Sequence, residues 1–312
     1  MFQPQGFEQR SIITSLGKMV YYTATGSLWQ DNETPQPERE TLVFLHGFGG
    51  GSSSYEWSKV YPAFAAEYRI LAPDLIGWGK SEHPARNYTI EDYLTVIREF
   101  VEQTCTTGPV TAIASSLTAA FTIRVAITHP HLFKSLVLVT PAGLSDFGED
   151  YSRSWFAQII SIPVLDRVLY STGVATSGGI RSFLEQRQFA QPNRIYEEIV
   201  ATYLESAQQP NAEYAALSFV RGDLCFDLSL YIQQLITPTA IIWGQKSQFT
   251  GPDIGRRLAE KNPQAIRVFQ PLEDVGLTPQ LELPAVTIGL IRRFLPLLSD
   301  KRIQHSVITI QK

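Results

Sequence analysis

The chain has 312 residues and a mass of 34.9 kDa, enough for one large domain or two smaller ones. Hydrophobic residues make up 44% of the sequence and charged residues 18%, which is typical of a globular protein and excludes a disordered or fibrous chain. Lys and Arg number 26 against 30 Asp and Glu, so the formal net charge of −4 lacks the basic excess that nucleic-acid binding requires.

Motifs for metals, cofactors and membranes are missing from the sequence. The two cysteines, Cys105 and Cys225, leave neither a disulfide framework nor a cysteine-based metal site. No His, Asp or Glu cluster has ligand spacing, and no phosphate-binding glycine loop carries a lysine, so we expect neither metal nor cofactor. The first ten residues are polar, unlike a signal peptide, and no uncharged apolar run reaches the ~18 residues of a membrane span. We therefore expect a soluble cytoplasmic protein.

Short strand patterns alternate with helical patterns along most of the chain. The predicted strands are residues 12–14, 19–23, 42–45, 68–72, 110–114, 135–139, 239–243 and 265–269, and the predicted helices are 55–68, 91–103, 117–128, 253–260 and 285–297. Such alternation predicts βαβ units and a parallel sheet. From residue 145 to residue 236 the pattern is helical and aromatic. We therefore expect a helical cap at 145–236, inserted into a core of residues 1–144 and 237–312.

Three segments stand where predicted strands end. The first is Leu-His-Gly-Phe-Gly-Gly at residues 45–50. The second is Pro-Asp-Leu-Ile-Gly-Trp-Gly-Lys-Ser at residues 73–81, where glycines permit a tight turn and Asp74 and Ser81 are expected to fix loop hydrogen bonds. The third, residues 110–119, places Ser116 between a strand and a helix.

With these segments the chain resembles the α/β-hydrolase superfamily over nearly its whole length. The resemblance implies a mostly parallel sheet flanked by helices, with an inserted helical cap. It also implies that Ser116 holds the nucleophile position and that the backbone N–H groups of Phe48 and Leu117 form an oxyanion hole. In the family's G-x-S-x-G turn, small residues flank a strained serine, but here Ala114 and Thr118 take those places. The β-branched Thr118 argues against the strained turn, and the alternative interpretation is that Ser116 is an ordinary helix N-cap.

The triad acid and base are absent from the positions at which the resemblance places them. After the strand ending at Trp243 the family carries G-x-x-D, whereas this chain reads Gly-Gln-Lys-Ser, so the acid is replaced by Ser247. Before a Glu-x-Pro the family carries Gly-His, whereas this chain reads Gly276-Leu277, so the base is replaced by Leu277. Leucine can neither accept nor return a proton, and a serine hydroxyl without an oriented base is a weak nucleophile.

Two residues are candidate substitutes. His83 follows the glycine-containing loop and is a candidate base, against the alternative of an ordinary surface-loop histidine. Asp146 is a candidate acid, because some members of the family keep their acid after the preceding strand.

We therefore interpret the chain as a diverged, weakly active or inactive pseudohydrolase that binds an apolar or amphipathic small molecule beneath its aromatic cap. Two alternatives stay open. One is a serine ester or thioester hydrolase with a non-standard base, and the other is a cofactor-free lyase-type enzyme that uses the oxyanion hole. Residues 49–57 and 76–79 resemble the branch of the family that is common in cyanobacteria and plastids.

Overall fold

The computed structural model describes residues 3–26, 28–29, 39–148, 169–300 and 308–309. In this part of the chain one sheet has the strand order β1-β2-β4-β3-β5-β6-β7-β8-β9. The strands are β1 (Phe7–Thr14), β2 (Gly17–Ala24), β3 (Thr41–Leu45), β4 (Arg69–Pro73), β5 (Val110–Ser115), β6 (Phe133–Val139), β7 (Thr239–Gly244), β8 (Ile266–Leu272) and β9 (Ile308–Thr309). The β1–β2 hairpin is antiparallel and β2 pairs antiparallel with β4, whereas all other pairs are parallel. The predicted, mostly parallel sheet is confirmed.

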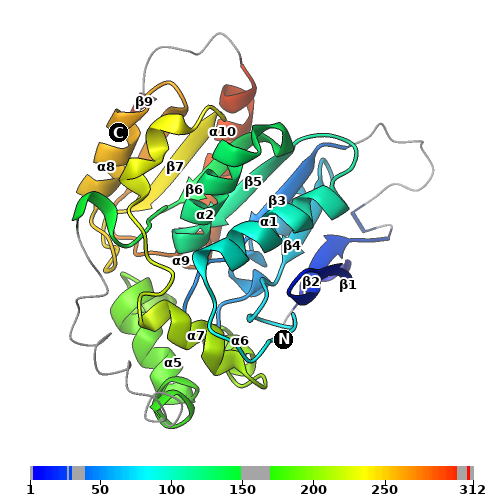
Figure 1. The fold of residues 1–312 in the computed structure, drawn as a ribbon, viewed down its shortest axis with the longest axis vertical. Coiled ribbons are helices and arrows are strands. Elements are labelled where there is room, and N and C mark those ends of the chain that lie inside the picture. Colours follow the sequence, from blue (N-terminus) through cyan, green and yellow to red (C-terminus); the bar gives the residue numbers. More distant parts are fainter. Residues whose placement is uncertain (1–2, 27, 30–38, 149–168, 301–307, 310–312) are drawn as a thin grey trace.

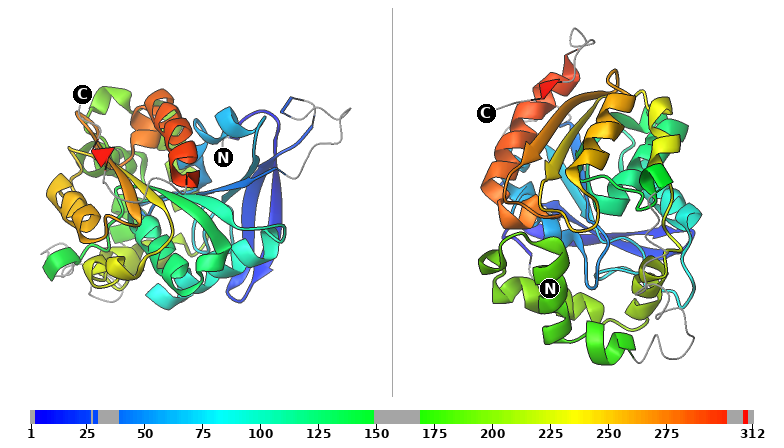
Figure 2. Two further views of the ribbon diagram at one scale, coloured as in Figure 1. Left: turned by 90° about the horizontal axis from the view of Figure 1, so that it is seen from above. Right: turned by 90° about the vertical axis from the view of Figure 1, so that its left-hand side faces the viewer.

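Helices cover both faces of the sheet (Figures 1 and 2). One layer contains α1 (Ile90–Thr104), α2 (Ser116–Thr128) and α8 (Pro252–Lys261), and the other contains α10 (Pro284–Ser299) and the 3₁₀ helices η1 (Ser54–Trp57) and η2 (Tyr61–Phe64). Strand side chains alternate between the layers, so that Val43 and Leu45 face α1 and α2 while Leu42 and Phe44 face the opposite layer. Because both faces are buried, the central strands are rich in apolar residues.

The predicted helix at residues 55–68 is wrong. This segment instead forms η1 and η2, in which the N–H groups of Ser58 and Ala65 bond to the carbonyl oxygens three residues earlier. Pro62 stands in the first turn of η2. It has no N–H and so cannot continue an α-helix from η1, which leaves two short turns in place of one helix.

A helical segment lies beyond the carboxyl ends of the parallel strands (Figure 1). It comprises α5 (Ser177–Phe183), α6 (Glu197–Ala207) and α7 (Ala212–Val220), with π-helical turns at Tyr170–Val174 and Leu184–Gln188. We call it the cap. Leu144 and Phe226 pair where the chain leaves and rejoins the core, and the Phe226 N–H donates to the Gly143 carbonyl at 2.8 Å. Residues 149–168 of the predicted 145–236 cap lie outside the described residues.

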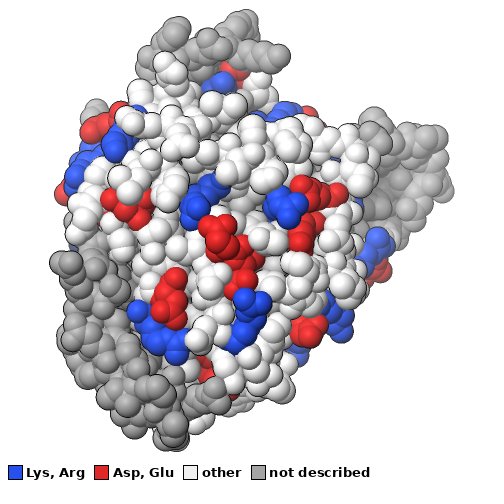
Figure 3. Space-filling model, viewed as in Figure 1, with Lys and Arg blue, Asp and Glu red and all other residues white. Residues whose placement is uncertain are grey.

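Acidic and basic side chains alternate on the face drawn in Figure 3. Ion pairs over α1 and α2 include Arg98 with Glu102 at 2.7 Å and Arg124 with Glu91 at 3.4 Å. Among the described residues, no helix is both long enough and apolar enough to cross a bilayer.

Candidate functional site

A strained turn joins β5 to α2 at Ser116. Ser116 has a φ of 55°, in the left-handed region that residues with side chains rarely adopt. The N-cap of α2 is Ser115, so the alternative interpretation of Ser116 as the N-cap is wrong. The strained turn forms even though the β-branched Thr118, two residues later, is fully buried.

The loop after β3 lies directly against this turn. A Cβ atom on Gly47 would stand 3.0 Å from Ser115 Oγ and 3.3 Å from Ser116 Cβ, so only glycine fits there without displacement. His46 fixes the loop, since its Nε2 accepts from the Leu75 N–H at 3.0 Å and its Nδ1 lies 2.7 Å from the Gly47 carbonyl. Burial lowers the pKa of His46 to about 4, so this histidine is neutral and structural.

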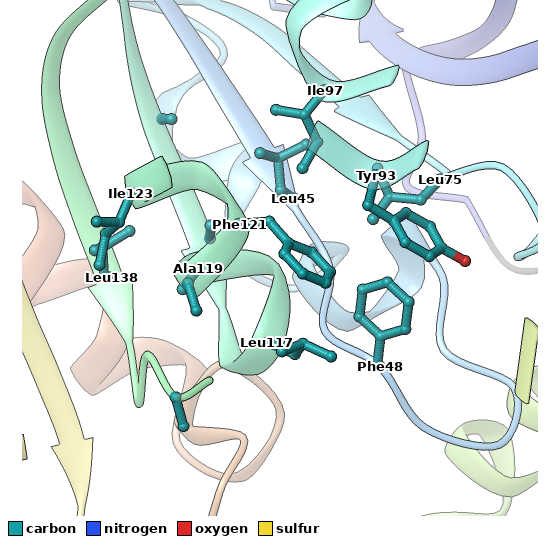
Figure 4. Packing of buried hydrophobic residues seen from close by; sticks show 14 of the residues in the cluster. Leu45, Phe48, Leu75, Tyr93, Ile97, Leu117, Ala119, Phe121, Ile123 and Leu138 are labelled. Carbon is teal, nitrogen blue, oxygen red and sulfur yellow. The ribbon is translucent and has the colours of Figure 1, made fainter. Parts of the chain in front are cut away.

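Phe48 and Leu117 are the buried residues that directly follow Gly47 and Ser116. The side chains of Phe48 and Leu117 pack into the core beside α1 and α2, with the Phe48 ring against Tyr93 and Phe121 (Figure 4). Among the described residues we find no hydrogen bond to the N–H of Phe48, to the N–H of Leu117 or to the Ser116 hydroxyl. The first N–H groups of a helix have no partner within it. Within the part of the chain that the structure describes, these two N–H groups therefore have no hydrogen-bond partner.

Glu56 of η1 is a candidate that the sequence analysis missed. Its side chain is fully buried, and its Oε2 accepts from the Gly47 N–H at 2.8 Å and from the Ser115 hydroxyl at 3.4 Å. Gly47 and Ser115 immediately precede Phe48 and Ser116. One carboxyl group thus connects the loop after β3 to the strained turn.

Glu56 also connects this turn to the cap. The Tyr203 hydroxyl of α6 lies 3.1 Å from Glu56 Oε1 and 3.2 Å from Gln188 Oε1. The single hydroxyl hydrogen of Tyr203 cannot bond to both of these oxygen atoms at once. If Glu56 carries a proton, Glu56 can donate to the Tyr203 oxygen and the Tyr203 hydroxyl can donate to Gln188. Burial raises the pKa of Glu56, and its partners are a backbone amide and hydroxyl groups. Burial therefore favours the protonated form of Glu56, while its hydrogen-bond donors act in the opposite direction.

Leu277 occupies the position at which the resemblance places the base. Its side chain is buried, and its N–H donates to the Gln188 carbonyl at 2.7 Å. Glu282 accepts from the Gly276 N–H at 2.6 Å and from the Ala190 N–H at 3.1 Å. The cap is thus docked on this loop, and Leu277 offers no group that can exchange a proton.

Ser247 stands at the position where the resemblance places the acid. Its N–H donates to the Gly244 carbonyl at 3.1 Å and closes the turn after β7. Its hydroxyl is buried, with no partner among the described residues. The side chain therefore brings a neutral polar group where an acid would bring a negative charge.

The candidate substitutes have other partners. Asp146 accepts from the Gly143 N–H at 2.9 Å and from the Leu228 N–H at 2.8 Å, so it ties together the two ends of the cap, and burial raises its pKa to about 6. His83 Nε2 lies 3.2 Å from the Gly79 carbonyl, and burial lowers the pKa of this ring. Within the described residues no hydrogen bond joins either side chain to Ser116.

The loop of residues 73–81 has the structural role expected from the sequence. Asp74 accepts from the Ser54 N–H at 2.7 Å and the Lys80 N–H at 2.8 Å, and Ser81 donates to the Asp74 carbonyl at 2.6 Å. These bonds secure the loop beside η1.

Four aromatic rings connect the loop after β3, the cap and the loop of Ser247. Ring centroids are 6.2 Å apart for Phe48 and Phe219, 6.2 Å for Phe219 and Phe249, and 6.4 Å for Phe249 and Phe183. The Phe183 ring lies 2.9 Å from where a Cβ of Gly49 would stand. We call these four rings the aromatic circuit. The aromatic circuit makes the surroundings of the loop after β3 apolar.

Comparison with known proteins agrees with this geometry. Residues 40–273 match the family model described as alpha/beta hydrolase fold. Lipase 1 of Psychrobacter immobilis is 24% identical over 95% of this chain and 86% of its own length. The 2-hydroxy-6-oxo-6-(2'-aminophenyl)hexa-2,4-dienoic acid hydrolase of Metapseudomonas resinovorans is 31% identical over 34% of this chain, a match that spans 37% of that relative. The structure of Cfl2 from Burkholderia cenocepacia superposes with a TM-score of 0.74 at 20% identity, covering 94% of this chain and 97% of that one.

Proposed function

The chain belongs to the alpha/beta hydrolase fold family, and we propose that within this family it has lost its triad and binds an apolar or amphipathic small molecule. The observation that carries the proposal is the buried Leu277, whose N–H is bonded to the cap at the position of the base. Ser247 supports it, because no acid stands at the third triad position. Without a base that takes its proton, the Ser116 hydroxyl is a weak nucleophile.

The aromatic circuit supports an apolar ligand. Phe183 and Phe249 are partly exposed, whereas Phe48 and Phe219 are buried, so the circuit runs from the core toward solvent. Rings arranged in this way provide contact area for a hydrophobic ligand next to a few polar groups, which is the usual composition of a small-molecule site.

A second candidate is a serine hydrolase with a non-standard base, and the strained Ser116 backbone favours it. Such a backbone conformation costs about 1–3 kcal/mol, and in enzymes of this fold it presents a nucleophile.

Intact-mass analysis after exposure to a fluorophosphonate, beside a Ser116→Ala control, distinguishes the two candidates. We expect no stoichiometric labelling of a protein that unfolds cooperatively. Labelling of the parent chain alone would overturn the proposal and identify an activated serine.

Restoring the missing side chains provides the converse test. The double variant Ser247→Asp with Leu277→His is expected to gain esterase activity over the parent by about 10²-fold or more, because it resupplies an oriented base. The triple variant that also carries Ser116→Ala is the control and should stay at the parental level. A parent already as active as the double variant would contradict the proposal.

A further inference from the structure

We propose that the loop of residues 274–282, which contains Leu277, clamps the cap onto the core, and that Glu282 is the point at which this clamp is released. The inference goes beyond the proposed function and does not depend on whether Ser116 reacts. Three observations carry it: the buried carboxyl group of Glu282, the close approach of the two backbones, and the packing of the cap on three consecutive glycines.

Glu282 joins the loop to the cap through one buried side chain. Its Oε1 accepts from the Gly276 N–H at 2.6 Å, within the loop. Its Oε2 accepts from two groups of the cap segment before α6, the Ala190 N–H at 3.1 Å and the Arg194 guanidinium at 3.2 Å. The same guanidinium donates to the Asp274 carbonyl at 2.9 Å. Hydrogen bonds of this kind are stronger than neutral ones, and a buried pair that loses one partner is strongly destabilised.

The backbones of the loop and the cap lie against each other at the same place. The Leu277 N–H donates to the Gln188 carbonyl at 2.7 Å. A Cβ atom on Gly276 would stand 2.2 Å from the Gln188 carbonyl oxygen and 2.9 Å from the Ala190 nitrogen. Because Gly276 has no side chain, the cap backbone can approach closely enough for this bond to form.

The cap also packs on the three consecutive glycines of the loop after β3. Each glycine faces a different residue of the cap. The pairs, with the distance from the position of a Cβ atom to the cap residue, are Gly49 with Phe183 at 2.9 Å, Gly50 with Val174 at 3.0 Å and Gly51 with the Tyr203 carbonyl oxygen at 2.0 Å. A side chain on any of these glycines would meet the cap, so the docked position of the cap depends on this run.

Two other ion pairs join the cap to the core at α6, and both are weaker. They are Lys59 with Glu198 and Lys80 with Glu205. All four side chains are 30–43% exposed, and ion pairs exposed to solvent contribute little to stability. The Glu282 side chain, in contrast, is fully buried. Loss of the contacts of Glu282 is therefore the change that loosens the cap most.

Release of the clamp would divide the aromatic circuit. Phe183 and Phe219 belong to the cap, whereas Phe48 and Phe249 belong to the core. Phe48 and Phe219 are buried, with their ring centroids 6.2 Å apart. A cap that lifts from the core separates these rings and exposes apolar surface, which a hydrophobic ligand can then reach. The clamp thus controls access to the aromatic circuit.

Hydrogen exchange of the full chain, measured by mass spectrometry, tests the clamp. The reporters are core N–H groups that donate to the cap: Leu277 to the Gln188 carbonyl, Gly79 to the Ser206 hydroxyl at 3.1 Å, and Tyr88 to the Ser218 hydroxyl at 3.0 Å. Leu277 lies in the clamp, whereas Gly79 and Tyr88 contact α6 and α7. Together they distinguish a local change at the clamp from lifting of the whole cap.

Glu282→Gln is expected to speed the exchange of all three reporters at least about tenfold, because glutamine is neutral and turns an NH₂ group toward a backbone donor. Glu197→Gln, at an ion pair with Arg181 inside the cap, is the matched control and should leave them unchanged. Faster exchange of Leu277 alone, or of none of the reporters, would overturn the proposal. Equal acceleration in β5 and β6 would mean that the whole domain unfolds, and would overturn it as well.

Gly276→Ala tests the clamp without removing the carboxyl group of Glu282. Its Cβ would press on the Gln188 carbonyl oxygen, so the same three reporters should exchange at least about tenfold faster. Gly178→Ala in α5, where a Cβ meets no atom within 4 Å, is the control and should not change the exchange. Unchanged exchange in Gly276→Ala would show that the cap does not depend on this contact and would refute the clamp.

The dye 1-anilinonaphthalene-8-sulfonate measures the exposure of the aromatic circuit. We expect its fluorescence with Glu282→Gln to be at least about twofold higher than with Glu197→Gln, because the dye binds apolar surface that a lifted cap exposes. Equal fluorescence, in a variant whose reporters exchange faster, would refute the control of the aromatic circuit by the clamp. Fluorophosphonate labelling, by contrast, bears only on the loss of catalysis.

Discussion

Substitution of Glu56 tests whether a neutral acid holds the strained turn. Glu56→Leu removes the acceptor of the Gly47 N–H and of the Ser115 hydroxyl, and it removes one of the two partners of the Tyr203 hydroxyl; all three groups are buried. A buried donor left unpaired costs about 1–3 kcal/mol. Because Tyr203 retains Gln188 as a partner and the Ser115 bond is long, we expect the free energy of unfolding to fall by about 3–5 kcal/mol in total.

Glu56→Gln is expected to lower the free energy of unfolding by less than about 1 kcal/mol, because glutamine has the shape and the hydrogen-bonding pattern of a protonated glutamate.

The pH dependence of the free energy of unfolding gives a second measurement. Burial raises the pKa of Glu56 above its ordinary value of 4.5. The contribution of Glu56 is therefore full below pH 4.5 and is lost as the pH rises through its folded pKa, whereas Glu56→Gln lacks this decline.

Urea denaturation of the parent and both variants across this pH range provides the free energies. Glu67→Gln, at an exposed ion pair with Arg292, is the control and should change the free energy by less than about 1 kcal/mol. If Glu56→Gln were as destabilised as Glu56→Leu, the side chain would be needed as a charged carboxylate, and the reasoning would be refuted.

Two further predictions concern Asp146, which ties together the two ends of the cap, and Gly47 in the loop after β3. Burial raises the pKa of Asp146 from 3.8 to about 6. Its contribution to the free energy of unfolding should therefore fall by about 3 kcal/mol as the pH rises through this range, and Asp146→Asn should abolish the fall. Urea titrations that give the parent and the variant the same pH profile would contradict this prediction. Gly47→Ala should destabilise the chain by about 1–3 kcal/mol in thermal unfolding, because the new Cβ would crowd Ser115 and Ser116. The control Gly173→Ala, whose Cβ meets open space, should not destabilise the chain. Equal melting temperatures of the two variants would show that the loop after β3 can shift.

The sequence indicated the sheet because the signals of its strands are local. Apolar runs such as Thr41–Leu45 and Val110–Ser115 predict buried parallel strands wherever they occur. The strained backbone of Ser116 could not be predicted from the residues beside it in the sequence. The buried Thr118 is accommodated by tertiary packing, which no local rule describes.

Glu56 escaped prediction because its partners are distant in sequence. Ser115 is 59 residues away and Tyr203 is 147 residues away. The predicted helix at 55–68 gave no reason for this carboxyl to face inward. The signal available was its setting between Tyr55 and Trp57, two aromatic residues that the structure buries completely, since a carboxylate is rarely buried without a partner.

The backbone strain at Ser116 needs an explanation that does not depend on a nucleophile. Under the proposed function, Leu277 and Ser247 leave the serine hydroxyl without a base to activate it, yet the turn still bears a cost of about 1–3 kcal/mol. The Leu117 N–H follows this turn, and Glu56 bonds to Gly47 and to Ser115, the residues that precede Phe48 and Ser116. We therefore infer that the strained turn maintains the two backbone donors, the N–H groups of Phe48 and Leu117. A site that binds an anionic oxygen uses that pair whether or not the serine reacts.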